Sequence, residues 1–116
     1  MGKISLNVPN SLSDLPEEER DLLLGRALRV AVKERVEQVE QELGEGQEKE
    51  AILEKKYGME FEAFEKKVEL QKFVGLDYQE DYHDWYFWRE SNQRTQQILQ
   101  NLRRFLADQI QRRDTT

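Results

Sequence analysis

The chain has 116 residues, no cysteine and a formal net charge of −6 from 18 basic and 24 acidic side chains. These values exclude disulfides, a thiolate nucleophile and cysteine-ligated zinc, and they disfavour a surface that coats nucleic acid uniformly. Only 37% of the residues are hydrophobic, which is lean for one compact core and favours elongated helices that pair with another chain. We expect a soluble, cytoplasmic protein without a membrane span or signal peptide, because no apolar run approaches about 20 residues.

Residues 4–8 are the first predicted element, a short strand in which apolar and polar side chains alternate until Pro9 ends it. A lone strand needs a partner for its backbone groups, and no second strand-like run follows, so we expect it to pair with its copy in a homodimer. An extended tail is the alternative. Lys3, Ser5 and Asn7 would form the polar face of a DNA-reading ribbon. The next segment is too short for a ribbon-helix-helix protein, so DNA binding is only weakly supported.

A long helix is predicted from the caps Ser13 and Asp14 to Leu43, with Gly44 as its C-cap. Its apolar residues first cover most of the circumference and then narrow to a seam with coiled-coil-like spacing. Gly25 interrupts this pattern at a cost of about 1 kcal/mol in helix propensity, which a close helix–helix crossing would justify. We therefore predict a homodimer or higher oligomer that packs through the strand and this helix. Its expected contacts are Ile4, Leu6, Val8, Leu24, Leu28, Val32, Val36 and Val39.

Gly44-Glu45-Gly46 is the predicted linker. It divides the chain into a dimerisation region, residues 1–46, and a helical partner-binding region, residues 47–116. Charge follows a different division, because residues 1–88 carry a net charge of −9 and residues 89–116 a net charge of +3. All six basic residues of the last part are arginines, which make planar, bidentate contacts that lysine cannot make.

Two short helices are predicted next. The first covers residues 47–57 and ends at Gly58, and the second starts near Glu60 and closes at residues 73–75. Neither is long enough to be stable alone in water, so both need a surface on which to pack. The apolar residues that share one face of the second helix are Phe61, Phe64 and Val68.

Residues 78–88 form an aromatic segment that holds six of the eleven aromatic residues. The segment opens a last helix, predicted at about 81–112, whose apolar stripe covers 99–110. Core packing is one interpretation of the aromatic segment. A docking surface for a partner protein is another, because Trp, Tyr and Arg dominate interface hot spots. Base stacking is the third, and the neighbouring carboxylates disfavour it because they repel phosphates.

His83 is the only histidine, and it lies among carboxylates and tyrosines. One histidine without cysteine is a poor ligand set for zinc, so we interpret His83 as a solvated or capping residue. The sequence has no nucleophile elbow, glycine-rich phosphate loop or zincin motif. We therefore expect no catalytic residue, no metal, no cofactor and no enzymatic activity.

Two stretches carry a resemblance to a known family. They are A-I-L-E-K-K-Y-G-M-E-F-E-A-F-E-K-K-V-E at residues 51–69 and D-Y-Q-E-D-Y-H-D-W at residues 77–85. This part of the chain resembles small antitoxins of archaeal and cyanobacterial type II toxin–antitoxin operons. The resemblance implies an inhibitor that wraps a small toxin, usually an RNA-cleaving enzyme, and that represses its own operon as a dimer. By matching positions, the helix anchors would be Phe61, Phe64, Tyr82, Trp85 and Trp88.

The prediction is an all-α, elongated protein with one short N-terminal strand that pairs across a homodimer. We expect an antitoxin that binds and neutralises a cognate toxin, expected to be a ribonuclease, by helix-mediated occlusion. The acidic part of the chain suits a basic partner independently of the resemblance. The alternative is a structural helical oligomerisation module with no toxin partner. The predicted partner-binding residues are Phe61, Phe64, Tyr78, Tyr82, Trp85, Trp88, Arg89 and Arg94.

Overall fold

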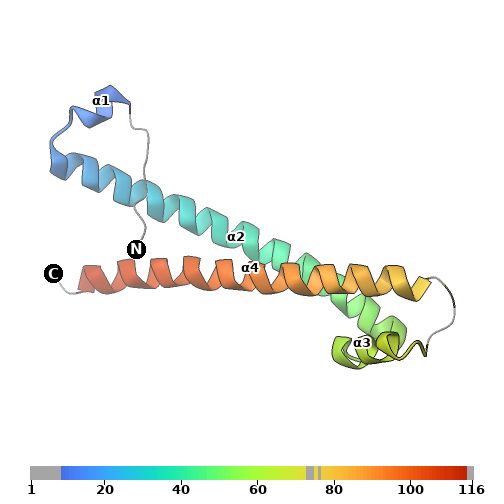
Figure 1. The fold of residues 1–116 in the computed structure, drawn as a ribbon. Helices are drawn as coiled ribbons and strands as arrows, with labels where there is room; N and C mark the ends of the chain where they lie inside the picture. The colour runs from blue at the N-terminus through green and yellow to red at the C-terminus, as the bar shows by residue number, and fades with distance from the viewer. Residues whose placement is uncertain (1–8, 73–74, 76, 115–116) are drawn as a thin grey trace.

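The computed structural model describes residues 9–72, 75 and 77–114, with side chains up to Gln109. It contains four helices, α1 (Asn10–Ser13), α2 (Glu17–Tyr57), α3 (Phe61–Glu69) and α4 (Asp77–Asp114). The two long helices run in opposite directions, and α3 packs beside the end where they are joined (Figure 1). The described part is therefore helical and elongated, as predicted. The predicted strand at residues 4–8 lies outside the described residues.

The start of α2 differs from the prediction. Pro16 precedes its first residue, and three glutamates occupy its first turn, where they complement the positive end of the helix dipole. The predicted caps do not begin this helix, because Ser13 ends the short helix α1 and its hydroxyl donates a hydrogen bond to the Asn10 carbonyl at 3.0 Å. Asp14 follows as the C-cap of α1. The proline thus separates two helices where one capped start was expected.

Helix α2 continues without a break through the predicted linker and ends at Gly58. The predictions of a C-cap at Gly44 and of a linker at Gly44-Glu45-Gly46 are therefore wrong, and the expected helix 47–57 is the last part of α2. Gly58 is the C-cap, as predicted, with a left-handed φ of 65°. Local propensity suggests a break at the two glycines, but packing against α4 keeps this stretch helical. The boundary proposed between 1–46 and 47–116 lies inside this one helix.

Gly46 lies in tight contact with α4. It is buried, and a Cβ atom added there would lie 2.0 Å from the Asn92 side-chain oxygen. The Asn92 amide donates a hydrogen bond to the Glu50 carboxylate at 2.7 Å, so its polar atoms are held in place. Gly46 is therefore a contact site for α4 and not a hinge.

Helices α3 and α4 also have different bounds from those predicted. α3 ends at Glu69, before the expected closure at residues 73–75, and Gln71 follows with a positive φ of 54°. α4 starts at Asp77, four residues earlier than expected, with acidic residues in its first turn. Those carboxylates favour the N-terminal end of a helix, which accounts for the earlier start.

The packed interior is small for the length of the chain. The molecule measures 69 × 32 × 24 Å, and its radius of gyration of 21.8 Å far exceeds the value of about 13 Å for a compact domain of this size. Its accessible surface is 9690 Å², against about 6,700 Å² for a compact protein of 13.9 kDa. The buried apolar side chains of the described part are Val39, Phe61, Phe64, Trp85 and Leu99. The fold thus leaves an unusually large surface free for a partner.

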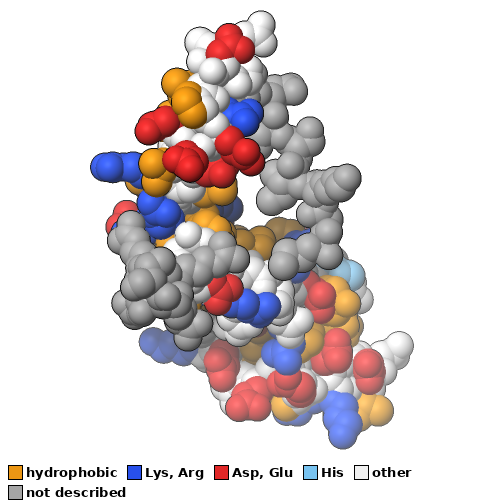
Figure 2. All heavy atoms as spheres, turned by 90° about the vertical axis from the view of Figure 1, so that its left-hand side faces the viewer, with side chains coloured by type: hydrophobic (Ala, Val, Ile, Leu, Met, Phe, Trp, Pro, Cys, Tyr) orange, Lys and Arg blue, Asp and Glu red, His pale blue; other side chains and the backbone are white. Residues whose placement is uncertain are grey.

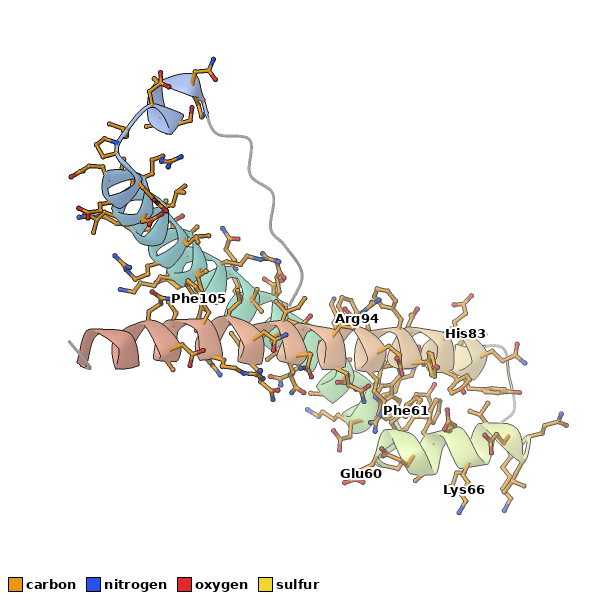
Figure 3. The ribbon with its side chains drawn as sticks, turned by 60° about the vertical axis from the view of Figure 1, so that its left-hand side comes forward. Glu60, Phe61, Lys66, His83, Arg94 and Phe105 are labelled. Atoms are coloured by element: carbon orange, nitrogen blue, oxygen red, sulfur yellow. The ribbon has the colours of Figure 1, made fainter. Side chains whose placement is uncertain are left out.

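The two long helices diverge at the end of the molecule opposite α3. They are held together by the Asn92–Glu50 contact and, further along, by a 2.8 Å ion pair between Arg103 and Glu40. Beyond the level of Phe105, the first half of α2 rises away from α4 (Figures 1 and 3). None of the described helices is both long and apolar enough to cross a membrane.

Candidate partner-binding surface

Three aromatic side chains form a core where α3 meets α4. Phe61 and Phe64 are one helical turn apart on α3, and both pack on Trp85 of α4, with ring centres 5.5 and 5.2 Å away. Tyr57 at the end of α2 closes the cluster, 4.3 Å from the Phe64 ring. Phe64 has no exposed surface and Trp85 is 2% exposed. Aromatic pairs at these distances contribute packing energy beyond the area they bury, so this cluster fixes α3 to the helix pair.

This placement follows the core-packing interpretation of the aromatic segment. Phe61, Phe64 and Trp85 lie inside the fold, and Tyr78 and Tyr82 are half-buried against them. A partner that meets this conformation therefore contacts other residues. Direct contact of the three core residues with a partner stays a prediction.

Asp81 connects α4 to the end of α2. Its carboxylate accepts hydrogen bonds from the Lys56 ammonium at 2.6 Å and from the Tyr57 hydroxyl at 2.5 Å. Partial burial alone would raise the pKa of Asp81, but these two hydrogen bonds outweigh it and lower the pKa. Burial and the bond to Asp81 raise the pKa of Tyr57, and the same carboxylate raises the pKa of Lys56. The contacts thus keep Asp81 ionised and Lys56 and Tyr57 protonated, which are the forms that these hydrogen bonds require.

Two more polar contacts connect α3 and α4. The Tyr82 hydroxyl donates to the Glu65 carboxylate at 2.8 Å, and this bond, with burial, raises the pKa of Tyr82. Arg89 forms an ion pair with Glu62, and its guanidinium lies 5.1 Å from the centre of the Phe61 ring. Both contacts are partly exposed, so each contributes about 1 kcal/mol or less. Arg89, a predicted partner-binding residue, is thus engaged within the chain.

The opposite side of α4 carries an outer face, which we define as Phe87, Arg94 and Ile98. These positions are seven and eleven residues apart and therefore share one side of the helix. All three side chains are exposed, Phe87 to 55%. Trp88, half-buried, meets the Phe87 ring edge-on at 5.2 Å. Arg94 and His83 point away from α3, whereas Phe61 lies between α3 and α4 (Figure 3).

Phe87 and Ile98 were not among the predicted site residues. The helical pattern places Phe87 away from the face that Tyr78, Tyr82 and Trp85 share. The helical spacing from Phe87 to Arg94 and Ile98 was the signal that could have found this face. Arg94 is the predicted site residue that lies fully on it.

An open hollow of about 410 Å³ lies beside the aromatic core. Its polar lining is mostly acidic, with Arg89 as its one cation. The carboxylates in it are Glu50, Glu54, Glu60 and Glu62. The negative charge of residues 1–88 thus includes a surface next to the aromatic core.

The predicted dimerisation residues of α2 fall into two groups. Val39 is fully buried and belongs to the contact between α2 and α4, so it is used within one chain. Leu28 is exposed, and Leu24, Val32 and Val36 are half-buried. Ile4, Leu6 and Val8 lie outside the described residues.

His83 is exposed on α4, and its ring centre lies 5.7 Å from that of Tyr82. Within the part of the chain that the structure describes, no three His, Asp or Glu side chains gather closely enough to hold a metal ion.

Comparison of the chain with protein-family models, with curated proteins and with solved structures finds no match in any of the three.

Proposed function

We propose that the protein binds and neutralises a basic partner protein by occlusion, in the manner of the antitoxins that it resembles. The observation that carries this proposal is the division of the aromatic segment into two edges. Trp85 is buried in the core, whereas Phe87 is 55% exposed on the outer face of α4. Arg94 lies two helical turns from Phe87 on the same side of α4, and aromatic residues and arginine are enriched at protein–protein interfaces.

Charge supports a basic partner. Residues 1–88 carry a net charge of −9, and four glutamates line the hollow beside the core. Complementary charge accelerates encounter and suppresses wrong partners, and a toxin that cleaves RNA carries a basic surface for the phosphates. The negative charge of residues 1–88 would therefore attract the partner, and the outer face of α4 would bind it.

The mechanism is the insertion of a helix into a groove. α4 would lie in the partner's active-site groove with Phe87 in an apolar pocket and Arg94 beside an acidic group of the partner. Substrate is then excluded because the helix occupies its place. No step requires the buried aromatic core to open.

The test is co-expression with the product of the adjacent reading frame. That product alone should arrest growth, and the chain should restore growth and co-purify with it. Phe87→Ala should weaken the complex at least tenfold, whereas Ile52→Ala, which truncates a 63% exposed apolar side chain on α2, should leave it unchanged. Absence of growth arrest, absence of a complex, or equal effects of the two variants would each contradict the proposal.

A second candidate function is a structural oligomerisation module without a toxin. It is supported by the large leucine side chains exposed at the start of α2, since monomeric proteins rarely expose contiguous apolar surface. Figure 2, which looks toward this end of the molecule, shows hydrophobic side chains among acidic and basic ones. Sedimentation without any partner tests this candidate, because it requires a stable oligomer of the chain alone.

A further inference from the structure

The first turns of α2 share a hollow with the short helix α1, and α4 diverges from them. The contacts of Asn92 with Glu50 and of Arg103 with Glu40 define the antiparallel register of the long helices. In this register, the end of α4 at Asp114 is about level with Leu28. The first turns of α2 diverge from the last turns of α4, as Figure 1 shows.

One face of the first turns of α2 is symmetric in a way that suits a two-fold axis. Gly25 lies at its centre, with Leu22 three residues before it and Leu28 three residues after it. Asp21 and Arg29 lie four residues before and after Gly25, on the same side of the helix. Leu22 is 67% exposed and Leu28 44% exposed. If two copies of α2 cross antiparallel at Gly25, each Leu22 meets Leu28 of the other copy, and each Asp21 meets Arg29.

The surrounding charges favour this antiparallel arrangement. Residues 17–21 carry a net charge of −3 and residues 26–35 a net charge of +3. An antiparallel pair places the acidic stretch of each copy on the basic stretch of the other, whereas a parallel pair aligns like charges. Neither Asp21 nor Arg29 forms an ion pair with another described residue.

Gly25 has no other evident use in the chain. Among the described residues, a Cβ atom added there would meet the Arg29 guanidinium alone, at 3.5 Å, so no packing in this part of the chain requires a glycine. A glycine at a helix crossing lets the backbones approach closely. Gly44 also faces open space, so a glycine with room around it does not by itself mark a helix crossing. The symmetric leucines and charges distinguish Gly25 from Gly44.

We propose that a second copy of this chain docks antiparallel on this face of α2, with the two-fold axis at Gly25. The chain as a whole exposes roughly 3,000 Å² more than a compact protein of its mass, and a standard interface covers about 800 Å² of each partner. This inference rests on the second candidate function. Its failure would be separate from failure of partner neutralisation, since the outer face of α4 has no part in it.

Charge reversal tests the pairing. Asp21→Arg places two arginines opposite each other twice per dimer, and Arg29→Asp does the same with two aspartates. Each variant should raise the dimer Kd about tenfold, as measured by sedimentation equilibrium, because two symmetric contacts of up to about 1 kcal/mol are reversed. A mixture of the two single variants should form heterodimers as tightly as the unchanged chain, since every contact is then between opposite charges.

Glu34→Arg is the matched control, because it makes the same charge change on the side of α2 opposite to Gly25. It should leave the Kd within about threefold. Circular dichroism checks that each variant keeps its helix content, which is expected because these side chains are exposed or only half-buried. A chain that stays monomeric up to millimolar concentration, single variants with unchanged Kd, or a mixture that forms no heterodimer would overturn the proposal.

Discussion

Replacement of Gly46 by alanine probes the crossing of the two long helices. The added methyl group would lie 2.0 Å from the oxygen and 3.0 Å from the carbon of the Asn92 amide. Asn92 is 6% exposed and is held by its bond to Glu50, so it cannot move away without loss of that bond. Gly44 is the matched control, because it lies two residues earlier in α2 with no atom within 4 Å of an added Cβ.

The expected effects have opposite signs. Alanine improves helix propensity by about 1 kcal/mol at either position, so Gly44→Ala should stabilise the protein by about that amount. At Gly46 the same gain is opposed by about 1–3 kcal/mol of overpacking and about 1–3 kcal/mol for a displaced buried amide. Gly46→Ala should therefore destabilise the protein by about 1–5 kcal/mol.

Urea unfolding followed by circular dichroism and tryptophan fluorescence measures both effects. Gly46→Ala should shift the midpoint down and Gly44→Ala should shift it up, with the same slope. Asn92→Ala in the Gly46→Ala background should recover part of the loss, because the clashing amide is then absent. Equal stability of the two glycine variants would refute the close approach of α4 at Gly46.

Three other predictions concern the core, the helix end and the pH dependence. Phe64→Ala should cost about 3–5 kcal/mol in urea unfolding and shift tryptophan emission to the red, and a loss below about 1 kcal/mol would contradict its complete burial. Gly58→Ala should cost about 1 kcal/mol because its φ is 65°, and an unchanged midpoint would argue against the left-handed cap. The lowered pKa of Asp81 contributes stability above its unfolded pKa of about 3.9, and this stability is lost as pH falls through the folded pKa. Asp81→Asn should thus lower the free energy of unfolding at pH 7, and this free energy should fall less steeply between about pH 5 and pH 2 than it does for the unchanged chain. If the free energies of unfolding of the variant and of the unchanged chain fall in parallel with pH, the contacts of Asp81 with Lys56 and Tyr57 are contradicted.

The parts of the fold that depend on local physics could be predicted from the sequence. Gly58 ends α2 because a left-handed residue suits a glycine. The spacing of Phe61, Phe64 and Val68 indicates one apolar face of α3, and the structure packs that face on α4. These features depend on residues that are neighbours in the chain, so a helical pattern is sufficient to find them.

Features that depend on contacts distant in the chain could not be predicted in the same way. Gly46 reads as a linker until Asn92, 46 residues later, is placed against it. The two edges of the aromatic segment differ only once α3 has selected Trp85 as its partner and has left Phe87 outside. The sequence thus identified the aromatic segment, but tertiary packing decided which of its residues remain available to a partner.

The central claim is that the exposed start of α2 is completed by a second copy, antiparallel about Gly25. The chain has no cysteine, so Glu19→Cys and Glu34→Cys each provide one site for a spin label. With a rise of 1.5 Å per residue and helix axes about 9 Å apart, the two copies of position 19 lie about 20 Å apart and those of position 34 about 28 Å apart. Pulsed electron paramagnetic resonance on the dimer should give a distance that is longer at position 34 than at position 19 by about this difference. Equal, short distances at both positions would indicate a parallel pair and contradict the account.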